Sequence, residues 1–169
     1  SLEIDPRIAT AEQAAFFKSV GFNRISMGLQ DFDLAVQKAI GRNQGRERTL
    51  DVYQGCRDAG FEGVNIDLVY GLPGQTSETF QKTLKEIIQL QPDRVACFSY
   101  AHVPWVRPNQ EKVDTTIMLE GYDKFQLFML TVDLFQDADY TWIGIDHFAK
   151  KDDELSVALR NKSLHRNFM

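Results

Sequence analysis

The chain contains few cysteines, and their spacing excludes several kinds of site. Its 169 residues include 2 cysteines, Cys56 and Cys97, which lie far apart and form no CxxC pattern. Neither a disulfide framework nor a zinc or iron–sulfur motif can be assembled from two such residues. We therefore expect both cysteines to be reduced, buried members of an apolar core.

Positive charge and long apolar runs are also scarce. The chain carries 19 lysines and arginines against 24 aspartates and glutamates, a formal net charge of −5, and so has no basic surface for nucleic acid or anionic lipid. No apolar run approaches the ~20 residues that cross a bilayer, and no stretch has the pattern of a signal peptide. These features predict a cytoplasmic protein without nucleic acid or a membrane as partner. The composition does not exclude a small or porphyrin-sized ligand.

Hydrophobic residues make up 43% of the chain, enough to bury the core of one domain or of part of one. Residues 1–6 alternate as in a strand, with no initiator methionine before them, and Pro6 ends the pattern. Because a domain seldom begins in the middle of a sheet, we expect the chain to be truncated at its N-terminal end.

Strands and helices alternate along the chain. Hydrophobic periodicity predicts both, and capping residues such as Thr10 with Gln13 mark where helices begin. The expected strands cover residues 2–5, 23–30, 64–70, 94–101 and 140–145, the last running into 146–148, and the expected helices cover 10–21, 31–41, 46–59, 77–90, 115–135 and a short segment after 152–154. Units averaging about 30 residues, without a G-x-G-x-x-G pattern, favour an α/β fold, a partial (β/α) barrel of parallel strands with outer helices.

The stretch 64–76 carries the first candidate for a functional residue. Asn65 and Asp67 lie on the same face of an otherwise apolar strand, which breaks at 71–74 and passes into a helix. A carboxylate within such a strand is costly to bury unless something binds it, and α/β proteins hold ligands at the carboxyl ends of parallel strands. Asp67 is therefore a candidate binding residue. That Asp67 only ties down a neighbouring loop fits the pattern equally well.

The loop 102–114 and the three histidines carry weaker signals. The loop follows a strand, where ligand contacts are common, although a plain surface loop is the simpler interpretation. His102 and His147 each follow a strand, but no H-x-H or H-E-x-x-H spacing supports a metal site, and His165 lies in a polar tail. We assign none of the three a metal-binding or catalytic role.

Several short segments together resemble one known family. They cover residues 1–7, 21–32, 65–73, 100–102, 146–149, 152–155 and 164–168. They are similar to the central part of the bacterial oxygen-independent coproporphyrinogen III oxidases, radical S-adenosylmethionine enzymes of haem biosynthesis. The Gly-Leu-Pro-Gly-Gln-Thr segment at 71–76 is shared by many radical S-adenosylmethionine proteins. The Tyr-Ala-His, Asp-His-Phe-Ala and Leu-His-Arg-Asn-Phe segments are narrower and argue against the related haem chaperones.

The resemblance implies a six-unit open barrel in which a CxxxCxxC motif, upstream of the strand at 2–5, holds a 4Fe-4S cluster. Because this motif is absent here, residues 1–169 are expected to be the central and C-terminal part of the barrel domain without its N-terminal cluster-binding segment, and to be inactive alone.

The implied reaction is the oxidative decarboxylation of two propionates of coproporphyrinogen III to give protoporphyrinogen IX. It uses S-adenosylmethionine, the cluster and an electron donor. Arg42 and Arg107 are candidates to hold the substrate carboxylates. The resemblance does not define an oligomeric state. A haem-binding chaperone of the same superfamily, without oxidase activity, is the alternative.

Carried over from the family, the S-adenosylmethionine contacts fall on Glu3, Gln30, Arg42, Asp67 and Ala101. Carboxylates suit the ammonium and ribose hydroxyls of this cofactor, and an arginine suits its carboxylate. Gln30 can both donate and accept hydrogen bonds, while Ala101 would contribute backbone groups. The periodicity alone places four of these residues at or near strand ends but leaves Arg42 as a solvated arginine in a loop.

Overall fold

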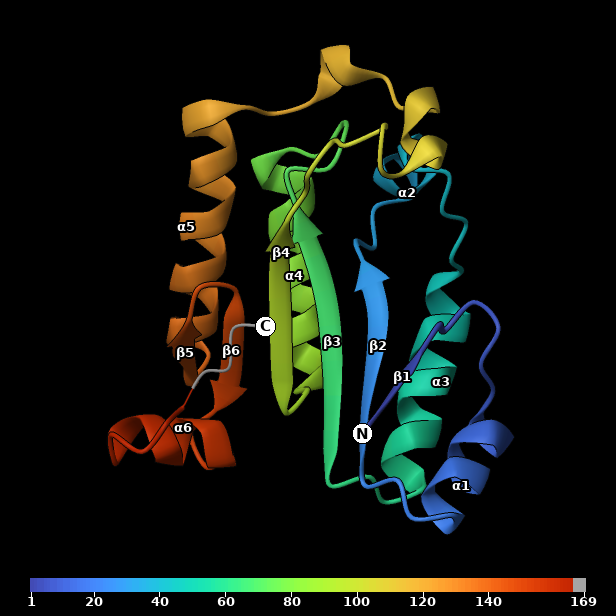
Figure 1. Ribbon diagram of the computed structural model, residues 1–169, viewed down its shortest axis with the longest axis vertical. Coiled ribbons are helices and arrows are strands. Elements are labelled where there is room, and N and C mark those ends of the chain that lie inside the picture. The colour runs from blue at the N-terminus through green and yellow to red at the C-terminus, as the bar shows by residue number, and fades with distance from the viewer. Residues whose placement is uncertain (166–169) are drawn as a thin grey trace.

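Six strands form one sheet in this computed structural model, which describes residues 1–165 (Figure 1). The strands span Leu2–Ile4 (β1), Arg24–Gln30 (β2), Gly63–Tyr70 (β3), Arg94–Ser99 (β4), Tyr140–Gly144 (β5) and His147–Lys150 (β6). Their order is β1-β2-β3-β4-β6-β5, and within the described residues no strand pairs with the outer edge of β1 or β5. The sheet is therefore open, in agreement with the expected partial barrel.

The first four strands are parallel and are connected by helices. The helices span Ala11–Ser19 (α1), Leu34–Ala39 (α2), Arg46–Asp58 (α3), Ser77–Leu90 (α4), Gly121–Asp137 (α5) and Glu154–Arg160 (α6). The expected capping box of Thr10 and Gln13 is confirmed, since each side chain pairs with the backbone of the other residue. None of the helices within residues 1–165 is long and apolar enough to cross a bilayer.

The expectation that all strands run parallel is wrong for β6. This strand lies between β4 and β5 and is antiparallel to both. Gly144 and Ile145 have φ angles of 117° and 55°, in the left-handed region, and reverse the chain after β5. The apolar run at 140–148 is therefore a tight hairpin, where alternation alone suggested one strand.

The expected helix from residue 115 begins later than predicted. Two short 3₁₀ turns, Pro108–Lys112 and Thr115–Ile117, precede α5, which starts at Gly121. Asp114 accepts hydrogen bonds from the backbone N–H and the hydroxyl of Thr116, at 2.9 and 2.6 Å. Asp114 therefore caps only the short 3₁₀ turn Thr115–Ile117. The backbone is extended again at Met118, so the turn does not continue into a helix.

One face of the sheet is buried against the helices. Alternate side chains of β2, β3 and β4 point to this face and have no exposed surface, among them Ile25, Met27, Leu29, Ile66, Leu68 and Val95. They share a single core with residues of α1, α3, α4 and α5, and Figure 1 shows α4 behind β3 and β4. The opposite face of the sheet is not covered by these helices.

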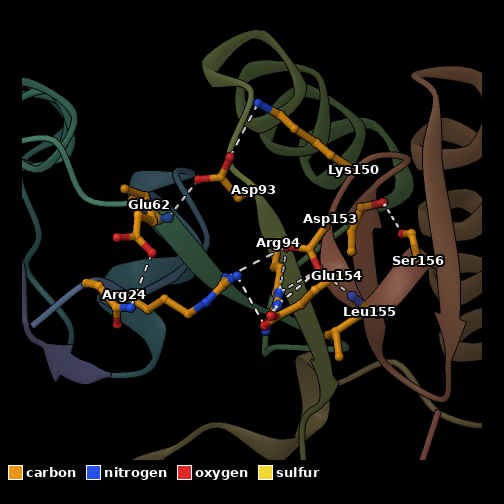
Figure 2. Close-up of polar contacts among 12 residues, drawn as sticks. Arg24, Glu62, Asp93, Arg94, Lys150, Asp153, Glu154, Leu155 and Ser156 are labelled. Atoms are coloured by element: carbon orange, nitrogen blue, oxygen red, sulfur yellow. Dashed lines mark hydrogen bonds and ion pairs between the residues drawn. The ribbon is translucent and has the colours of Figure 1, made fainter. Parts of the chain in front are cut away.

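Charged side chains pair with one another at the amino end of the sheet (Figure 2). Arg94, the first residue of β4, donates to both carboxylate oxygens of Asp153 at 3.1 and 3.0 Å and to Glu154 at 2.7 Å. Arg24, the first residue of β2, lies 3.7 and 3.1 Å from the same two carboxylates. Asp153 also accepts the Leu155 N–H as the N-cap of α6, so the cluster ties β2, β4 and α6 together.

Candidate functional site

The face of the sheet opposite the helices carries polar side chains. In the strand register Glu3 lies beside Ser26, Ser26 beside Asn65, and Gly28 beside Asp67. Because neighbouring residues of parallel strands point to the same side, these residues share one face. Ser26, Asn65 and Asp67 are half-buried and Glu3 is exposed, so the face remains open to a ligand.

Asp67 is a half-buried carboxylate with spare hydrogen-bonding capacity. Its two oxygens accept from the Ser26 hydroxyl, at 3.2 and 3.1 Å, and from no other donor in the described residues. Burial raises the pKa of this carboxyl, and the negative charge of Glu3 adds to the rise. Beside it, the buried Oδ1 of Asn65 has no hydrogen-bond partner within residues 1–165. Asp67 therefore has capacity for further donors on the open face, and Asn65 adds a second, buried acceptor in the same strand.

Arg42 lies over the carboxyl end of β2. Its Nη2 donates to the Gly28 carbonyl at 2.5 Å and lies 3.7 Å from a carboxylate oxygen of Asp5, while its Nε donates to Gln44 at 2.7 Å. Burial lowers the pKa of this guanidinium, and the nearby charge of Arg7 acts in the same direction. Arg42 lies in a loop, as the periodicity predicts, but its side chain is not solvated, because three contacts hold it in place.

Gln30 and Gly28 of β2 lie next to Arg42. Gln30 has a φ angle of 72°, a conformation that is rare for a residue with a side chain. A Cβ atom at Gly28 would lie 2.9 Å from Gln30 Nε2 and 3.6 Å from Arg42 Nη2. Gly28 therefore makes room for the two polar side chains to pack across the strand.

A cleft of about 520 Å³ opens at the carboxyl ends of the strands. The segment between β4 and α5 passes over the sheet at this end (Figure 1). The lining residues include Arg7, Gln30, Arg42, Leu72, Tyr100 and Arg107. Three arginines at one cleft suit a ligand with several carboxylates.

Tyr100 lines the cleft but is not among the site residues predicted from the sequence. Its hydroxyl is buried and lacks a hydrogen-bond partner in the described part of the chain, and burial raises its pKa. Tyr100 directly follows β4 and lines the cleft together with Gln30 and Arg42. The strand alternation could have identified it, because it continues the period that places Ala96 and Phe98 on the open face.

The structure brings three of the five predicted contacts into one hollow. Glu3, Gln30 and Arg42 line a space of about 340 Å³ next to the larger cleft. Asp67 lies beside Gly28, which lines the same hollow. Ala101 lines neither space, and its carbonyl accepts a hydrogen bond from Gln110 Nε2 at 3.1 Å.

The cysteines and histidines do not converge on a metal site. Burial raises the pKa of Cys56 to about 11 and that of Cys97 to about 12, and both are free, buried thiols, as expected. His147 pairs through Nδ1 with Asp146 Oδ1 at 2.5 Å. Among residues 1–165, no three His, Cys, Asp or Glu side chains lie close enough to hold a metal ion.

Comparison with known proteins identifies relatives along the whole chain. The model of the Radical SAM superfamily matches residues 1–87. The oxygen-independent coproporphyrinogen III oxidase of Helicobacter pylori strain J99 is 48% identical over 168 residues, which cover 99% of this chain and 37% of that protein. The enzyme of the same name from Escherichia coli K12 is 42% identical over 99% of this chain and 37% of its own length. The chain thus spans little more than a third of these relatives.

Solved structures extend the same likeness to the fold. The coproporphyrinogen III oxidase (HemN) of Escherichia coli, described as a radical SAM enzyme, superposes with a TM-score of 0.94 at 41% identity, over 98% of this chain and 38% of that one. The radical S-adenosylmethionine methyltransferase TsrM of Kitasatospora setae superposes with a TM-score of 0.54 at 16% identity, over 60% of this chain and 20% of that one, and supports the fold alone. The predicted partial (β/α) barrel of the radical S-adenosylmethionine type is confirmed. The segment 166–168, part of the sequence resemblance, lies outside the described residues.

Proposed function

The chain belongs to the Radical SAM superfamily, and we propose that it is the central part of an oxygen-independent coproporphyrinogen III oxidase. The reaction of the complete protein would be the oxidative decarboxylation of two propionates of coproporphyrinogen III, giving protoporphyrinogen IX in haem biosynthesis. The observation that carries this proposal is the superposition with the Escherichia coli enzyme, at a TM-score of 0.94 and 41% identity over 98% of the chain. The superposed region covers nearly the whole chain and so includes the carboxyl ends of the parallel strands, where this architecture holds its ligands.

S-adenosylmethionine is the cofactor that we assign to the open face of the sheet. The proposal gives its ammonium and ribose hydroxyls to Glu3 and Asp67 and its carboxylate to Arg42. The spare acceptor capacity of Asp67 and the unpartnered Oδ1 of Asn65 support this assignment, because both suit a ligand rich in donors. Gln30 would contact the cofactor from the end of β2, and Ala101 through its backbone after β4.

The described residues do not fit the 4Fe-4S cluster. Cys56 lies in α3 and Cys97 in β4, both are buried as free thiols, and no metal-binding group is found within residues 1–165. The proposal therefore places the cluster ligands in a CxxxCxxC motif of the complete protein outside this chain, and we expect this segment alone to be inactive. When bound, the cluster and S-adenosylmethionine supply the radical chemistry, while the residues of this chain bind, orient and shield.

The proposal also defines the surroundings of the enzyme. The complete enzyme would need a one-electron donor outside this chain. It would act in the cytoplasm, with neither nucleic acid nor a membrane as a partner. The net charge of −5 supports the absence of polyanionic partners. The arginines that line the cleft, Arg7, Arg42 and Arg107, suit a substrate with several carboxylates.

An anaerobic assay of the full-length protein tests the function. The protein is reconstituted with iron and sulfide and incubated with coproporphyrinogen III, S-adenosylmethionine and dithionite. The products are oxidised to porphyrins and separated by chromatography. We expect protoporphyrin to accumulate only when S-adenosylmethionine is present, because the chemistry depends on this cofactor. The matched control omits S-adenosylmethionine from an otherwise identical reaction.

A haem titration of the same preparation distinguishes the oxidase from the alternative, a haem-binding chaperone. Stoichiometric haem binding without loss of coproporphyrinogen would overturn the oxidase proposal and favour the haem-binding chaperone. Turnover without stable haem binding supports the oxidase.

A further inference from the structure

Six of the eight buried polar residues in the described chain form one hydrogen-bond network behind the candidate site. They come from the end of β2, the segment between β2 and α3, the start of α3, and the β3–α4 turn with α4. None is more than 2% exposed, and they are Asp31, Gln37, Gln44, Thr49, Gln75 and Thr83. Buried polar groups are costly unless paired, so a network of this size suggests a role beyond filling the core.

Asp31 is the charged centre of this network. Its Oδ1 accepts the Thr83 hydroxyl at 2.5 Å and the Asp33 N–H at 2.9 Å, and its Oδ2 accepts Gln75 Nε2–H at 2.6 Å. Burial raises the pKa of this carboxyl, while the three hydrogen bonds oppose the rise. Three donors therefore converge on a carboxylate with no exposed surface.

One arm of the network runs from Asp31 to the turn after β3. Gln75 Nε2 donates to Asp31 and to the Val69 carbonyl, at 2.6 and 3.1 Å. Gln75 Oε1 accepts the N–H groups of Gly71 and Leu72, at 2.6 and 3.3 Å. These contacts use both N–H bonds and both lone pairs of the amide, so Asp31 and the three backbone groups together fix its orientation. Leu72, held in this way, lines the 520 Å³ cleft.

A second arm runs from the backbone of Asp31 to Arg42. Gln37 Nε2 donates to the Asp31 carbonyl at 2.7 Å, and its Oε1 accepts the Gln44 N–H at 3.0 Å. Gln44 Oε1 in turn accepts from Arg42 Nε at 2.7 Å, while its Nε2 donates to Thr49 at 2.9 Å. Arg42 lines the same cleft as Leu72. Both arms therefore end at the walls of one space.

Gln30, between the two arms, is held in an unusual conformation. The Asp31 N–H donates to the Leu29 carbonyl at 3.0 Å, which closes a three-residue turn around Gln30 at a φ of 72°. Three-residue turns with positive φ are rare and strained. The contacts that anchor Asp31 on the following residue hold the chain in this turn and direct Gln30 toward the cleft.

We propose that Asp31 is a positioning residue for the S-adenosylmethionine site, which sets Gln30, Arg42 and the 71–74 turn in one arrangement before the ligand binds. The inference rests on the proposed function, since the ligand comes from it. An amide in place of the carboxylate would turn its N–H₂ toward Gln75 Nε2 or toward the Thr83 and Asp33 donors. Gln75 could avoid the first conflict only by presenting donors to the N–H groups of Gly71 and Leu72. Preorganisation of the site would therefore be lost although the shape is kept.

The test measures S-adenosylmethionine binding by the full-length protein with isothermal titration calorimetry, together with the melting temperature. We expect Asp31→Asn to weaken binding by roughly tenfold or more, as seen when residues that orient a binding group are changed. Gln44→Met removes the hydrogen bonds to Arg42 and to Thr49 but leaves those of the Asp31 carboxylate, and should weaken binding by a smaller factor. The matched control is Thr131→Val. Thr131 is also fully buried and donates to the Leu127 carbonyl at 2.8 Å, but it lies outside the network.

Hydrogen exchange gives a readout that does not depend on the ligand. In Asp31→Asn the amides of Gly71 and Leu72 should exchange faster, while in Gln44→Met they should be unchanged. If Asp31→Asn and Thr131→Val lower the melting temperature alike and both bind within about twofold of the unchanged protein, Asp31 is merely structural and the inference is overturned. If Asp31→Asn does not fold, Thr83→Val, which removes one of the three donors to the Asp31 carboxylate, decides by the same criterion.

The outcomes also separate this inference from the function. If the unchanged protein binds S-adenosylmethionine tightly but does not convert coproporphyrinogen, the oxidase proposal is overturned. The affinity of Asp31→Asn relative to the unchanged protein then still supports or overturns the role of Asp31. A protein that converts coproporphyrinogen equally well with Asp31→Asn, at the same KM for S-adenosylmethionine, would overturn the inference alone. Failure of the unchanged protein to bind S-adenosylmethionine would overturn both.

Discussion

The two ends of the sheet treat their charged residues in opposite ways. At the amino end, Arg24 and Arg94 pair with Asp153 and Glu154. Toward the carboxyl end, midway along β3, Asp67 has the Ser26 hydroxyl as its single hydrogen-bond donor in the described residues. Charged groups at the amino end are paired with one another, whereas Asp67 keeps capacity for a ligand.

This difference indicates which residues serve stability and which serve binding. A buried carboxylate that is paired with arginines stabilises the fold as long as its partners remain. A half-buried carboxylate with few partners is a cost to the fold that binding a ligand can offset. The contrast predicts that substitutions at the amino end change stability without changing affinity, and that substitutions at the carboxyl end do the reverse.

The largest effect is expected from Asp153→Ala at the amino end. Its side chain is 5% exposed, pairs with Arg94 and caps α6. Removing it leaves two half-buried guanidinium groups with the exposed Glu154 as their remaining carboxylate partner in the cluster. The free energy of unfolding of the full-length protein should fall by about 3 kcal/mol. Urea unfolding measures this change, with Asp152→Ala as the control, because Asp152 is the exposed neighbour. If Asp153→Ala also lowers the affinity for S-adenosylmethionine, the two ends of the sheet do not differ in the way proposed.

Asp67→Ala at the carboxyl end should have the second largest effect, on affinity. We expect S-adenosylmethionine binding by the full-length protein to weaken about 100-fold, or about 2.8 kcal/mol, because a carboxylate contact is lost. The free energy of unfolding should not fall, since the variant removes a desolvated charge. Calorimetry and urea unfolding measure the two quantities, with the exposed Asp51→Ala as control. Unchanged affinity and turnover would remove Asp67 from the site.

A smaller effect should appear in the pH dependence of stability at Asp67. Its pKa is raised in the folded protein above the ordinary value of 3.8. Over the pH range between the unfolded and the folded pKa, the folded state holds one more proton than the unfolded state, so its stability falls as the pH rises. Asp67→Asn should therefore match the unchanged protein at the acid end and become the more stable one at higher pH. Unfolding curves at several pH values measure the difference, and a gain that shrinks with rising pH would contradict the raised pKa.

The smallest effect is expected from Glu154→Ala, which sharpens the comparison within the amino end. Glu154 contacts the same two arginines as Asp153, but its side chain is 67% exposed. Exposed ion pairs contribute little, so the free energy of unfolding should fall by less than about 1 kcal/mol. Urea unfolding beside Asp153→Ala measures the ratio. Equal losses for the two variants would mean that burial does not govern this cluster.

Local patterns predicted most of the fold. The period-two alternation of β3 assigned Asn65 and Asp67 to one face, and helix signals predicted α1, α3 and α4 closely. The errors fall where the chain reverses or turns within a few residues. The hairpin at Gly144 depends on backbone angles that apolar alternation does not encode.

The sequence by itself determined which side chains share the open face of the sheet, because alternation follows from the pleat of each strand. Only the tertiary structure decided what holds that face in place. Asp31 meets Gln75 and Thr83, which lie 44 and 52 residues away, and Arg42 reaches back 14 residues to the Gly28 carbonyl. No local pattern predicts such contacts, since each partner would satisfy its own hydrogen bonds in water until the packing of β2, β3 and α4 removes the water and leaves only one another.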